Sequence, residues 1–247
     1  MQMSRLNHID EFREVLSHYQ LSEKAKETLQ GIRFALLVGP SSSGKNTIIN
    51  ELVKSGDYHC VVSDTTRLPR VNNGILEENG REYWFRSESD LLADLKAGAF
   101  LEAAIIHNQQ VSGISIRELT SVATDHKIAI NEIEVVGADH IHRLVPSAQF
   151  VFVVPPSFDE WITRMNARGE LPADETKRRL ESAVTELQVA LKRDYYVFVV
   201  NDTFVQTTKR VDAIIRERAV AEDGQDSAKA VARQLLDDTQ EFLSRLK

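Results

Sequence analysis

Five apolar runs of strand length recur along the chain, at residues 34–38, 60–63, 127–133, 150–154 and 196–200. Most of them are apolar throughout rather than alternating, which is typical of parallel strands covered on both faces. Between them, apolar residues at helical spacing predict helices at residues 89–96, 137–144, 158–168, 174–192 and 203–217. The order of strand and helix predicts an α/β fold with a doubly wound parallel sheet flanked by helices.

Two stretches interrupt this alternation. Residues 65–119 carry turn signals such as Asn-Gly at 79–80, and residues 168–174 contain a glycine and a proline. In sheets of this kind, ligands bind over the carboxyl ends of the strands. We therefore expect both stretches to be insertions that contribute to a binding site.

Helical spacing also appears at the start of the chain. In residues 1–30, apolar positions between Ile9 and Tyr19 predict one helix, and Ser22 is the expected cap of a second helix that ends near Gln30. These residues form a predicted N-terminal helical extension.

The other end of the chain follows a similar pattern. Residues 221–247 begin with the polar segment 222–226 and then recover helical spacing, which predicts a linker followed by a C-terminal helix. One domain is expected between the two extensions, at residues 31–220. The terminal helices either pack on this domain or pair with another chain, which makes a homodimer possible.

The segment GPSSSGK, residues 39–45, directly follows the first apolar run and precedes an amphipathic stretch. Its spacing matches a phosphate-binding loop between a strand and a helix. The glycines allow consecutive backbone N–H groups to point at a phosphate, the following helix adds its positive end, and Lys45 adds a full charge. The sequence therefore predicts a nucleotide site here.

Composition narrows the class of protein. With 42% hydrophobic and 27% charged residues, the chain is ordinary for a soluble globular protein, and its polar start lacks an apolar secretory segment, so we expect a cytoplasmic protein. A net charge of -7 argues against broad binding to nucleic acid or to anionic membranes. The single cysteine, Cys60, excludes an internal disulfide and cannot by itself form a zinc site.

Further motifs carry a resemblance to a known family. Residues 63–70 read SDTTRLPR, residues 79–85 read NGREYWF, and residues 98–102 read GAFLE. Together with the loop, they resemble the guanylate kinase family over residues 32–218. The resemblance implies a P-loop NTPase-type parallel core, with an acceptor-binding insertion at about residues 64–119 and a lid at about residues 160–180.

The resemblance also implies a reaction, the transfer of the terminal phosphoryl group of ATP to GMP or dGMP with Mg²⁺, which yields ADP and GDP. No protein nucleophile is needed, because the second pKa of a phosphate monoester is about 6 and the acceptor is already largely a dianion at neutral pH. Catalysis then depends on positioning and on neutralisation of charge. The catalytic residues implied are Lys45, Arg67, Arg164, Arg168 and Arg179.

For the donor, the resemblance implies binding by the loop and by the residue after the last strand. The ATP-binding residues are Gly39, Ser41, Ser42, Ser43, Gly44, Lys45, Asn46, Thr47 and Asn201. Asn46 stands where such loops usually have a magnesium-binding hydroxyl, so its amide oxygen and the carboxylate of Glu132 are the candidate metal ligands. Ser42 replaces a glycine, and we expect this to be tolerated only if the residue does not need a positive φ.

For the acceptor, the resemblance implies a phosphate clamp and a base-reading group. The GMP-binding residues are Ser63, Arg67, Arg70, Tyr83, Glu102, Ser112, Glu132 and Glu134. A carboxylate at Glu102 can accept from both N1–H and N2–H₂ of guanine, whereas adenine offers no such donor pair. The family has a tyrosine before a glycine where Ser112 precedes Gly113, and Ile114 follows, so we expect weakened GMP affinity.

Two other functions remain open at this point. One is a related phosphotransferase that acts on another acceptor, such as ribose 1,5-bisphosphate. The other is a catalytically weak module that binds phosphorylated proteins. The intact Gly44 and Lys45 argue against the binding module, and Ser63 with Glu102 favours GMP over a sugar phosphate.

Overall fold

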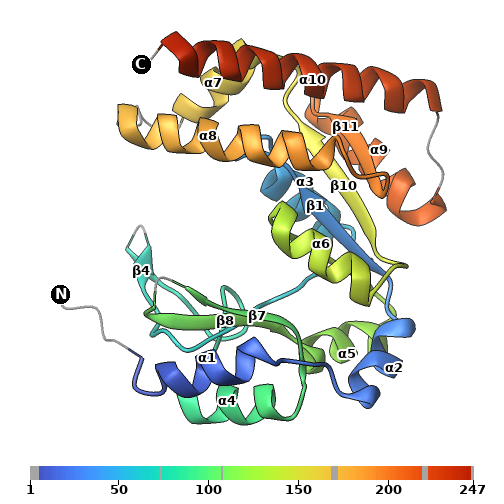
Figure 1. Ribbon diagram of the computed structural model, residues 1–247. Helices are drawn as coiled ribbons and strands as arrows, with labels where there is room; N and C mark the ends of the chain where they lie inside the picture. The colour runs from blue at the N-terminus through green and yellow to red at the C-terminus, as the bar shows by residue number, and fades with distance from the viewer. Residues whose placement is uncertain (1–5, 73, 107, 168–171, 219–221, 246–247) are drawn as a thin grey trace. The chain divides into compact units, whose positions relative to one another are not determined.

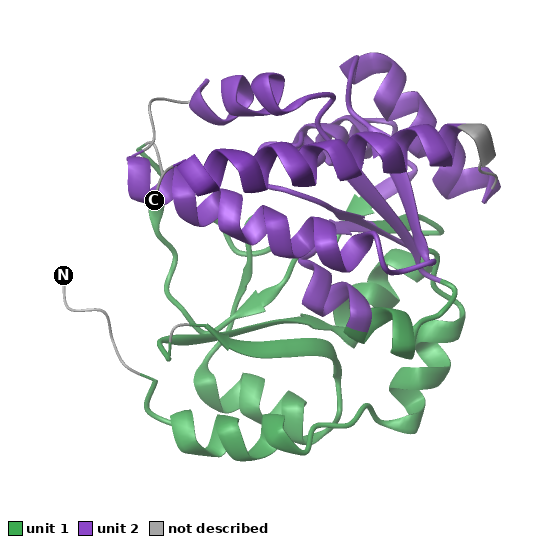
Figure 2. Ribbon diagram, turned by 45° about the horizontal axis from the view of Figure 1, so that its top comes forward, with its two compact units in different colours: residues 1–33, 59–129, 140–147 green, residues 34–58, 130–139, 148–247 purple. Residues whose placement is uncertain are grey.

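The computed structural model describes residues 6–72, 74–106, 108–167, 172–218 and 222–245 (Figure 1). These residues form two compact units (Figure 2). Unit 1 consists of Met1–Arg33, His59–Ala129 and His140–Ser147, and unit 2 of Phe34–Tyr58, Ile130–Asp139 and Ala148–Lys247. The predicted boundaries at residues 30 and 220 separate terminal helices from a central domain, which is a different division from these two compact units, and they stay predictions.

Unit 2 is built on parallel strands. Strand β10 pairs in parallel with β1 on one side and β11 on the other, within a five-stranded sheet of order β11-β10-β1-β9-β2. Every residue of β1 is buried, as its uninterrupted apolar sequence predicts. The strands of this sheet are β1 (Phe34–Val38), β2 (Tyr58–Cys60), β9 (Ile128–Glu132), β10 (Gln149–Val154) and β11 (Tyr196–Val200), and β2 and β9 each include residues assigned to unit 1.

The predicted strand at residues 60–63 is wrong in its position, because β2 ends at Cys60. The backbone N–H of Val62 donates to the carboxylate of Glu118 at 3.0 Å, so a side chain takes a donor that a longer strand would need. The apolar pattern alone carries no sign of this contact.

Helices follow the strands of unit 2 as the alternation predicts, and the α/β class is confirmed. Helix α3 follows β1, α7 and α8 follow β10, and α9 follows β11. The helices are α3 (Lys45–Lys54), α7 (Phe158–Asn166), α8 (Ala173–Ala190), α9 (Phe204–Glu217) and α10 (Glu222–Arg245), while α6 (Val135–Leu144) begins in unit 2 and ends in residues assigned to unit 1.

The predicted C-terminal linker is wrong, because residues 222–226 form the first turns of α10. Gln225 also donates to the carbonyl of Phe198 and accepts from its N–H, both at 2.9 Å, which covers backbone groups on the edge strand β11. Helix α10 runs alongside α8 and contacts α7, β10 and β11 (Figure 1).

Unit 1 holds a second sheet of order β6-β3-β8-β7 and a separate hairpin formed by β4 and β5. The strands are β3 (Asp64–Thr65), β4 (Val71–Asn72), β5 (Ile75–Leu76), β6 (Trp84–Phe85), β7 (Phe100–Ile106) and β8 (Gln110–Ser115). The helices are α1 (Ile9–Ser17), α2 (Glu23–Gln30), α4 (Glu88–Lys96) and α5 (Ile116–Thr124). The insertion predicted at about residues 64–119 thus has its own sheet.

The N-terminal helices pack within unit 1. Phe12 of α1 is fully buried in a cluster with Leu91 and Phe100, and Ser22 caps α2 by accepting from the N–H of Ala25. Tyr19 lies beyond the end of α1, contrary to its helical spacing, because its hydroxyl exchanges hydrogen bonds with the backbone of Phe100. Packing within the chain covers the apolar side of α1, and the homodimer stays a prediction.

Candidate active site

The loop between β1 and α3 has the backbone of a phosphate cradle. Gly39 and Gly44 adopt φ values of +132° and +100°. A Cβ at Gly39 would lie 2.3 Å from the carbonyl oxygen of Val153, and one at Gly44 would lie 2.2 Å from Nδ2 of Asn201. A side chain would clash at either position, so the loop packs closely on β10 and on Asn201 directly before the start of α3.

Lys45 is the charged group of this loop. Its Nζ donates to the carbonyls of Gly39 at 2.6 Å and Pro40 at 3.0 Å, and lies 4.0 Å from a carboxylate oxygen of Glu132. Only 12% of the side chain is exposed. Burial lowers the pKa of Lys45, while the negative charges of Glu132, Glu186 and Glu134 act against that decrease. An anion that enters beside the loop would therefore meet a desolvated ammonium group.

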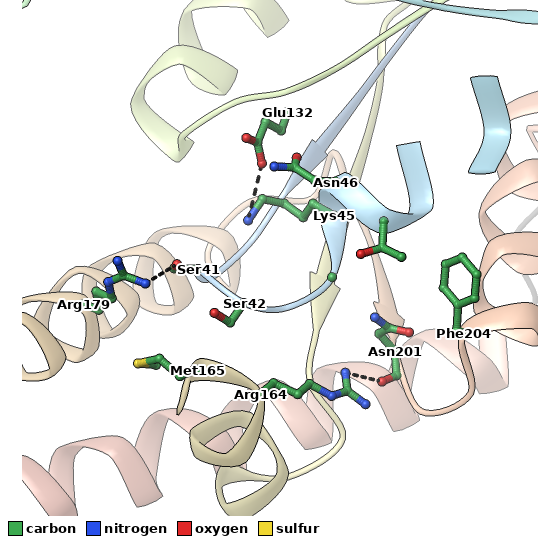
Figure 3. A pocket seen from close by; sticks show the side chains of 12 residues that line it. Ser41, Ser42, Lys45, Asn46, Glu132, Arg164, Met165, Arg179, Asn201 and Phe204 are labelled. Atoms are coloured by element: carbon green, nitrogen blue, oxygen red, sulfur yellow. Dashed lines mark hydrogen bonds and ion pairs between the residues drawn. The ribbon is translucent and has the colours of Figure 1, made fainter. Parts of the chain in front are cut away.

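A cavity of about 600 Å³ lies beside the loop (Figure 3). It brings together most of the residues predicted to bind ATP, with two of the predicted lid arginines. Its lining consists of Ser41, Ser42, Gly44, Lys45, Asn46, Thr47, Glu132, Arg164, Met165, Arg179, Asn201 and Phe204. Sequence reasoning missed Met165 and Phe204, because apolar residues at helical spacing predict core positions as readily as a ligand site.

The two arginines reach the cavity from different helices. Arg164 of α7 donates to the carbonyl of Asn201 and to Glu160, each at 2.9 Å. Arg179 of α8 donates to Glu175 at 2.8 Å and to the hydroxyl of Ser41 at 3.4 Å. Both cations are held beside the loop by neutral or acidic partners that a nucleotide phosphate could replace. Arg168, the third predicted lid arginine, lies outside the described residues.

Ser43 and Asn201 connect the loop to the end of β11. The Asn201 side chain donates to the carbonyl of Ser43 at 2.8 Å, and its backbone N–H donates to Val154 at 2.7 Å. The hydroxyl oxygen of Ser43 is buried and has no hydrogen-bond partner among the described residues. A buried hydroxyl without a partner is costly, and Ser43, like Gly39, is not among the residues that line the cavity.

The condition stated for Ser42 is not met, because its φ is +64°. A residue other than glycine in this left-handed region costs about 1 to 2 kcal/mol. The family's glycine would avoid that cost. Surrounding contacts must therefore hold the Ser42 backbone in place.

The predicted oxygen donors for magnesium are compatible with the ion. Asn46 and Glu132 line the same cavity, together with the hydroxyl residue Thr47, and Mg²⁺ in such sites takes one or two protein oxygens in addition to phosphates and water. No group of three or more acidic, histidine or cysteine side chains that could hold a metal occurs within the described ranges. Any bound magnesium would therefore depend on the nucleotide for most of its ligands.

In unit 1, the predicted phosphate clamp is organised around a carboxylate that sequence reasoning missed. Glu77 accepts from Nη1 and Nη2 of Arg67 at 2.5 and 2.9 Å, and from the backbone N–H of Arg70 at 2.9 Å. The Arg67 and Glu77 side chains are only 10% and 7% exposed. The Arg67 guanidinium also lies 4.6 Å from the ring centre of Tyr83. The hydrogen bonds with Glu77 raise the pKa of Arg67 above the ordinary value of an arginine.

This arrangement distinguishes the two arginines of the clamp. The fork of Arg67 is held by Glu77, whereas the side chain of Arg70 is exposed and has no hydrogen-bond partner among the described residues. Glu77 follows the exposed hairpin of β4 and β5, seven residues after Arg70. That distance along the sequence concealed the pairing.

Of the predicted base-reading residues, Glu102 lies in β7 and Ser63 directly precedes β3 of the same sheet. Glu102 stands at a register shift in β7 opposite Ile114 of β8, and burial raises the pKa of its carboxyl group. The carbonyl of Ser63 accepts from the N–H of Trp84 at 2.9 Å. Gly113 has to be glycine, because a Cβ there would lie 2.4 Å from the carbonyl oxygen of Glu102.

The hydroxyl of Ser112 forms hydrogen bonds with neighbouring strand residues. Its hydroxyl lies 2.8 Å from that of Thr65 and 3.3 Å from Nε2 of Gln110. These contacts connect β8 to β3, where the two residues pair. The hydroxyl of Ser112 is therefore a weaker candidate for phosphate binding than the tyrosine it replaces.

Glu132 and Glu134, predicted for the acceptor, belong to unit 2, and both are exposed.

A further carboxylate, Glu186 of α8, interacts electrostatically with Lys45 and Glu134. Burial raises the pKa of Glu186 to about 7, the charge of Glu134 adds to the increase, and Lys45 opposes it. Its position next to the buried side of α8, three residues after Ala183, is the only sequence signal for it.

We expect Glu186→Gln to change how stability depends on pH. Between about pH 4.5 and 7, the unfolded chain loses the Glu186 proton while the folded chain retains it, so the free energy of unfolding falls as pH rises. Because glutamine does not titrate, the variant lacks this decrease in the free energy of unfolding. Relative to the parent, it should gain about 1 to 3 kcal/mol between pH 5 and pH 8 in urea denaturation. An equal difference between the two proteins at both pH values would contradict the raised pKa.

Comparison with known proteins decides the family. The guanylate kinase family model matches residues 31–218, which include the loop, the cavity and the arginine clamp. The chain belongs to the guanylate kinase family. The family resemblance predicted from the sequence is confirmed, while α1, α2 and α10 lie outside the matched residues.

Similar proteins include guanylate kinases of several bacteria. That of Corynebacterium efficiens is 31% identical over 185 residues, which are 74% of this chain and 94% of the relative. That of Nocardia farcinica is 36% identical over 178 residues, 69% of this chain and 86% of the relative. A crystal structure of guanylate kinase from Anaplasma phagocytophilum aligns with a TM-score of 0.53 at 22% identity, over 84% of this chain and 94% of that one, and supports the fold.

Proposed function

We propose that this protein transfers the terminal phosphoryl group of ATP to GMP, or to dGMP, and releases ADP and GDP. The observation that carries the proposal is the phosphate-binding loop of a guanylate kinase family member, with Lys45 beside a cavity that Arg164 and Arg179 also line. The two other functions open at the start, another acceptor or a binding module, are not favoured by this family membership.

The donor phosphates would bind along the loop. The N–H groups between Gly39 and Lys45 and the start of α3 offer donors and a positive potential to the β- and γ-phosphates. Lys45 would exchange its two backbone carbonyl partners for phosphate oxygens, which form stronger, charge-assisted hydrogen bonds. Mg²⁺, held by the phosphates with Asn46, Thr47 or Glu132, would supply further charge neutralisation.

Transfer would then depend on neutralising the charge that the two substrates bring together. The phosphate of GMP is the nucleophile and needs no protein base. Arg164 and Arg179 can donate to the transferring group from α7 and α8. Each arginine would have to leave a partner of the present structure, the Asn201 carbonyl for Arg164 and the Ser41 hydroxyl for Arg179.

The acceptor would bind through unit 1. Arg70 offers an uncommitted guanidinium, while Glu77 holds Arg67 in one orientation beside Tyr83. Guanine donors would favour the ionised form of Glu102 and offset the effect of burial on its pKa. The resulting preference for guanine follows from hydrogen-bond polarity, because adenine would leave this carboxylate without donors.

We further propose that the protein acts in purine nucleotide metabolism in the cytoplasm, where both substrates occur. No helix in the parts of the chain that the structure describes is long and apolar enough to cross a membrane.

The proposed reaction is tested by following the transferred phosphorus. The protein is incubated with Mg²⁺, GMP and ATP labelled at the γ-phosphate, and the nucleotides are separated by anion exchange. We expect label in GDP, in step with ADP formation, and none without GMP. Label that appears only as inorganic phosphate, at the same rate with and without GMP, would contradict the proposal.

A further inference from the structure

Trp161 connects helix α7 to the phosphate-binding loop. It is the largest fully buried side chain among the described residues, with 0% exposure. Its indole Nε1–H donates to the carbonyl oxygen of Ser41 at 2.7 Å. Trp161 does not line the nucleotide cavity, whereas Ser41 and Ser42 do. The indole therefore contacts the loop from outside the cavity lining.

This contact fixes the orientation of one peptide group. The peptide between Ser41 and Ser42 is trans, as are all described peptides, so its C=O and N–H point in opposite directions. Because the C=O points to the buried indole, the N–H of Ser42 points away from Trp161. That N–H is one of the donors that a phosphate-binding loop offers to its ligand.

The same peptide precedes the strained residue of the loop. Ser42 adopts a φ of +64°, where glycine would be free of strain. A strained backbone persists only where surrounding contacts hold it. The hydrogen bond from Trp161 to Ser41 is such a contact, next to the residue that bears the strain.

Aromatic packing holds Trp161 in turn. The ring of Phe158 meets the Trp161 ring edge-on, with centroids 6.1 Å apart, and the ring of Phe242 lies 5.3 Å from that of Phe158. Phe242 belongs to α10, outside the segment that matches the family model. Helix α10 thus supports the loop through two aromatic contacts and one hydrogen bond.

We propose that Trp161 is a positioning residue for the ATP phosphates: its indole N–H orients the Ser41–Ser42 peptide and stabilises Ser42 in its left-handed conformation, with α10 as support. The inference rests on the proposed function only in taking ATP as the ligand of the loop. Direct binding of ATP tests it without any phosphoryl transfer.

The test measures ATP binding by calorimetry for Trp161→Phe, which keeps an aromatic ring and removes the N–H. We expect the Kd for ATP to rise about tenfold, as for the loss of one well-placed hydrogen bond. The KM for GMP should change less than twofold. Adding Ser42→Gly should recover at least half of the loss on a logarithmic scale, because glycine needs no support at a positive φ.

A general loss of packing would give a different pattern. If Ser42→Gly improves ATP binding by the same factor with Trp161 and with Phe at position 161, the two residues are not coupled and the proposal is wrong. An unchanged Kd in Trp161→Phe would also overturn it. Phe12→Leu, which removes buried volume from unit 1, serves as the control and should lower the melting temperature without changing the Kd for ATP.

A second variant keeps the test decisive if Trp161→Phe does not fold. Phe242→Leu alters the ring contact between α10 and Phe158, which is the contact furthest from the loop in the series. We expect it to raise the Kd for ATP about two- to threefold, and Ser42→Gly should reverse that change. If Phe242→Leu binds ATP as the parent does, α10 has no part in positioning the loop. If in addition Trp161→Phe does not fold, this result overturns the entire proposal.

Discussion

Lys45→Ala should lose on the order of a hundredfold or more in kcat, because removal of one preorganised charge at the transferring phosphates typically costs a few kcal/mol. The side chain lies in the loop, donates to two of its carbonyls and faces the cavity that holds the predicted donor site. Steady-state rates at saturating ATP and GMP measure the effect.

Folding should change much less than turnover in this variant. Burial opposes the charge of Lys45, so its replacement removes a desolvation cost along with the two hydrogen bonds. We expect a melting temperature within a few degrees of the parent. Near-parental turnover in Lys45→Ala would contradict the assignment of residues 39–45 as the phosphate-binding loop, whatever the stability.

Arg67→Lys should raise the KM for GMP by about tenfold and leave the KM for ATP within twofold. Lysine retains the charge but loses the planar fork that meets both oxygens of Glu77 and lies over Tyr83. The carboxylate of Glu77 is nearly buried and also holds the backbone of Arg70, so the whole clamp should loosen. Initial rates with each substrate varied in turn measure the two constants.

Arg81→Lys is the matched control for this prediction. Arg81 pairs with Glu78 and Glu82 on the surface of the same segment, and exposed pairs of this kind contribute little. Both KM values should therefore stay within twofold of the parent. If Arg67→Lys instead weakens ATP binding and spares GMP, Arg67 serves the donor, and the predicted clamp is wrongly placed.

Much of the fold could be predicted from local sequence. Continuous apolar runs at residues 34–38 and 196–200 became β1 and β11 without a shift, because burial on both faces demands such runs. Errors occurred where a side chain from a distant part of the chain took a backbone group. Glu118 accepts from the N–H of Val62, beyond the end of β2. Gln225 accepts from the N–H of Phe198, and the polar segment that contains it is part of α10.

The candidate site was predictable to a similar extent and for related reasons. The loop could be recognised because its glycines and Lys45 form a motif that is local in the sequence. Glu77 and Trp161 could not, because each acts through a partner that spacing does not reveal. The positive φ of Ser42 was also inaccessible, since the contact that supports it comes from α7.

The central claim, a guanine-specific phosphoryl transfer, is tested most directly by initial rates of ADP release with a panel of acceptors. The panel contains GMP, dGMP, AMP, CMP, UMP and ribose 1,5-bisphosphate, each with ATP and Mg²⁺. GMP or dGMP should give a kcat/KM at least about tenfold above every other acceptor, since an unpaired Glu102 carboxylate costs about 1 to 3 kcal/mol. Equal or faster transfer to AMP or to the sugar phosphate would contradict the account.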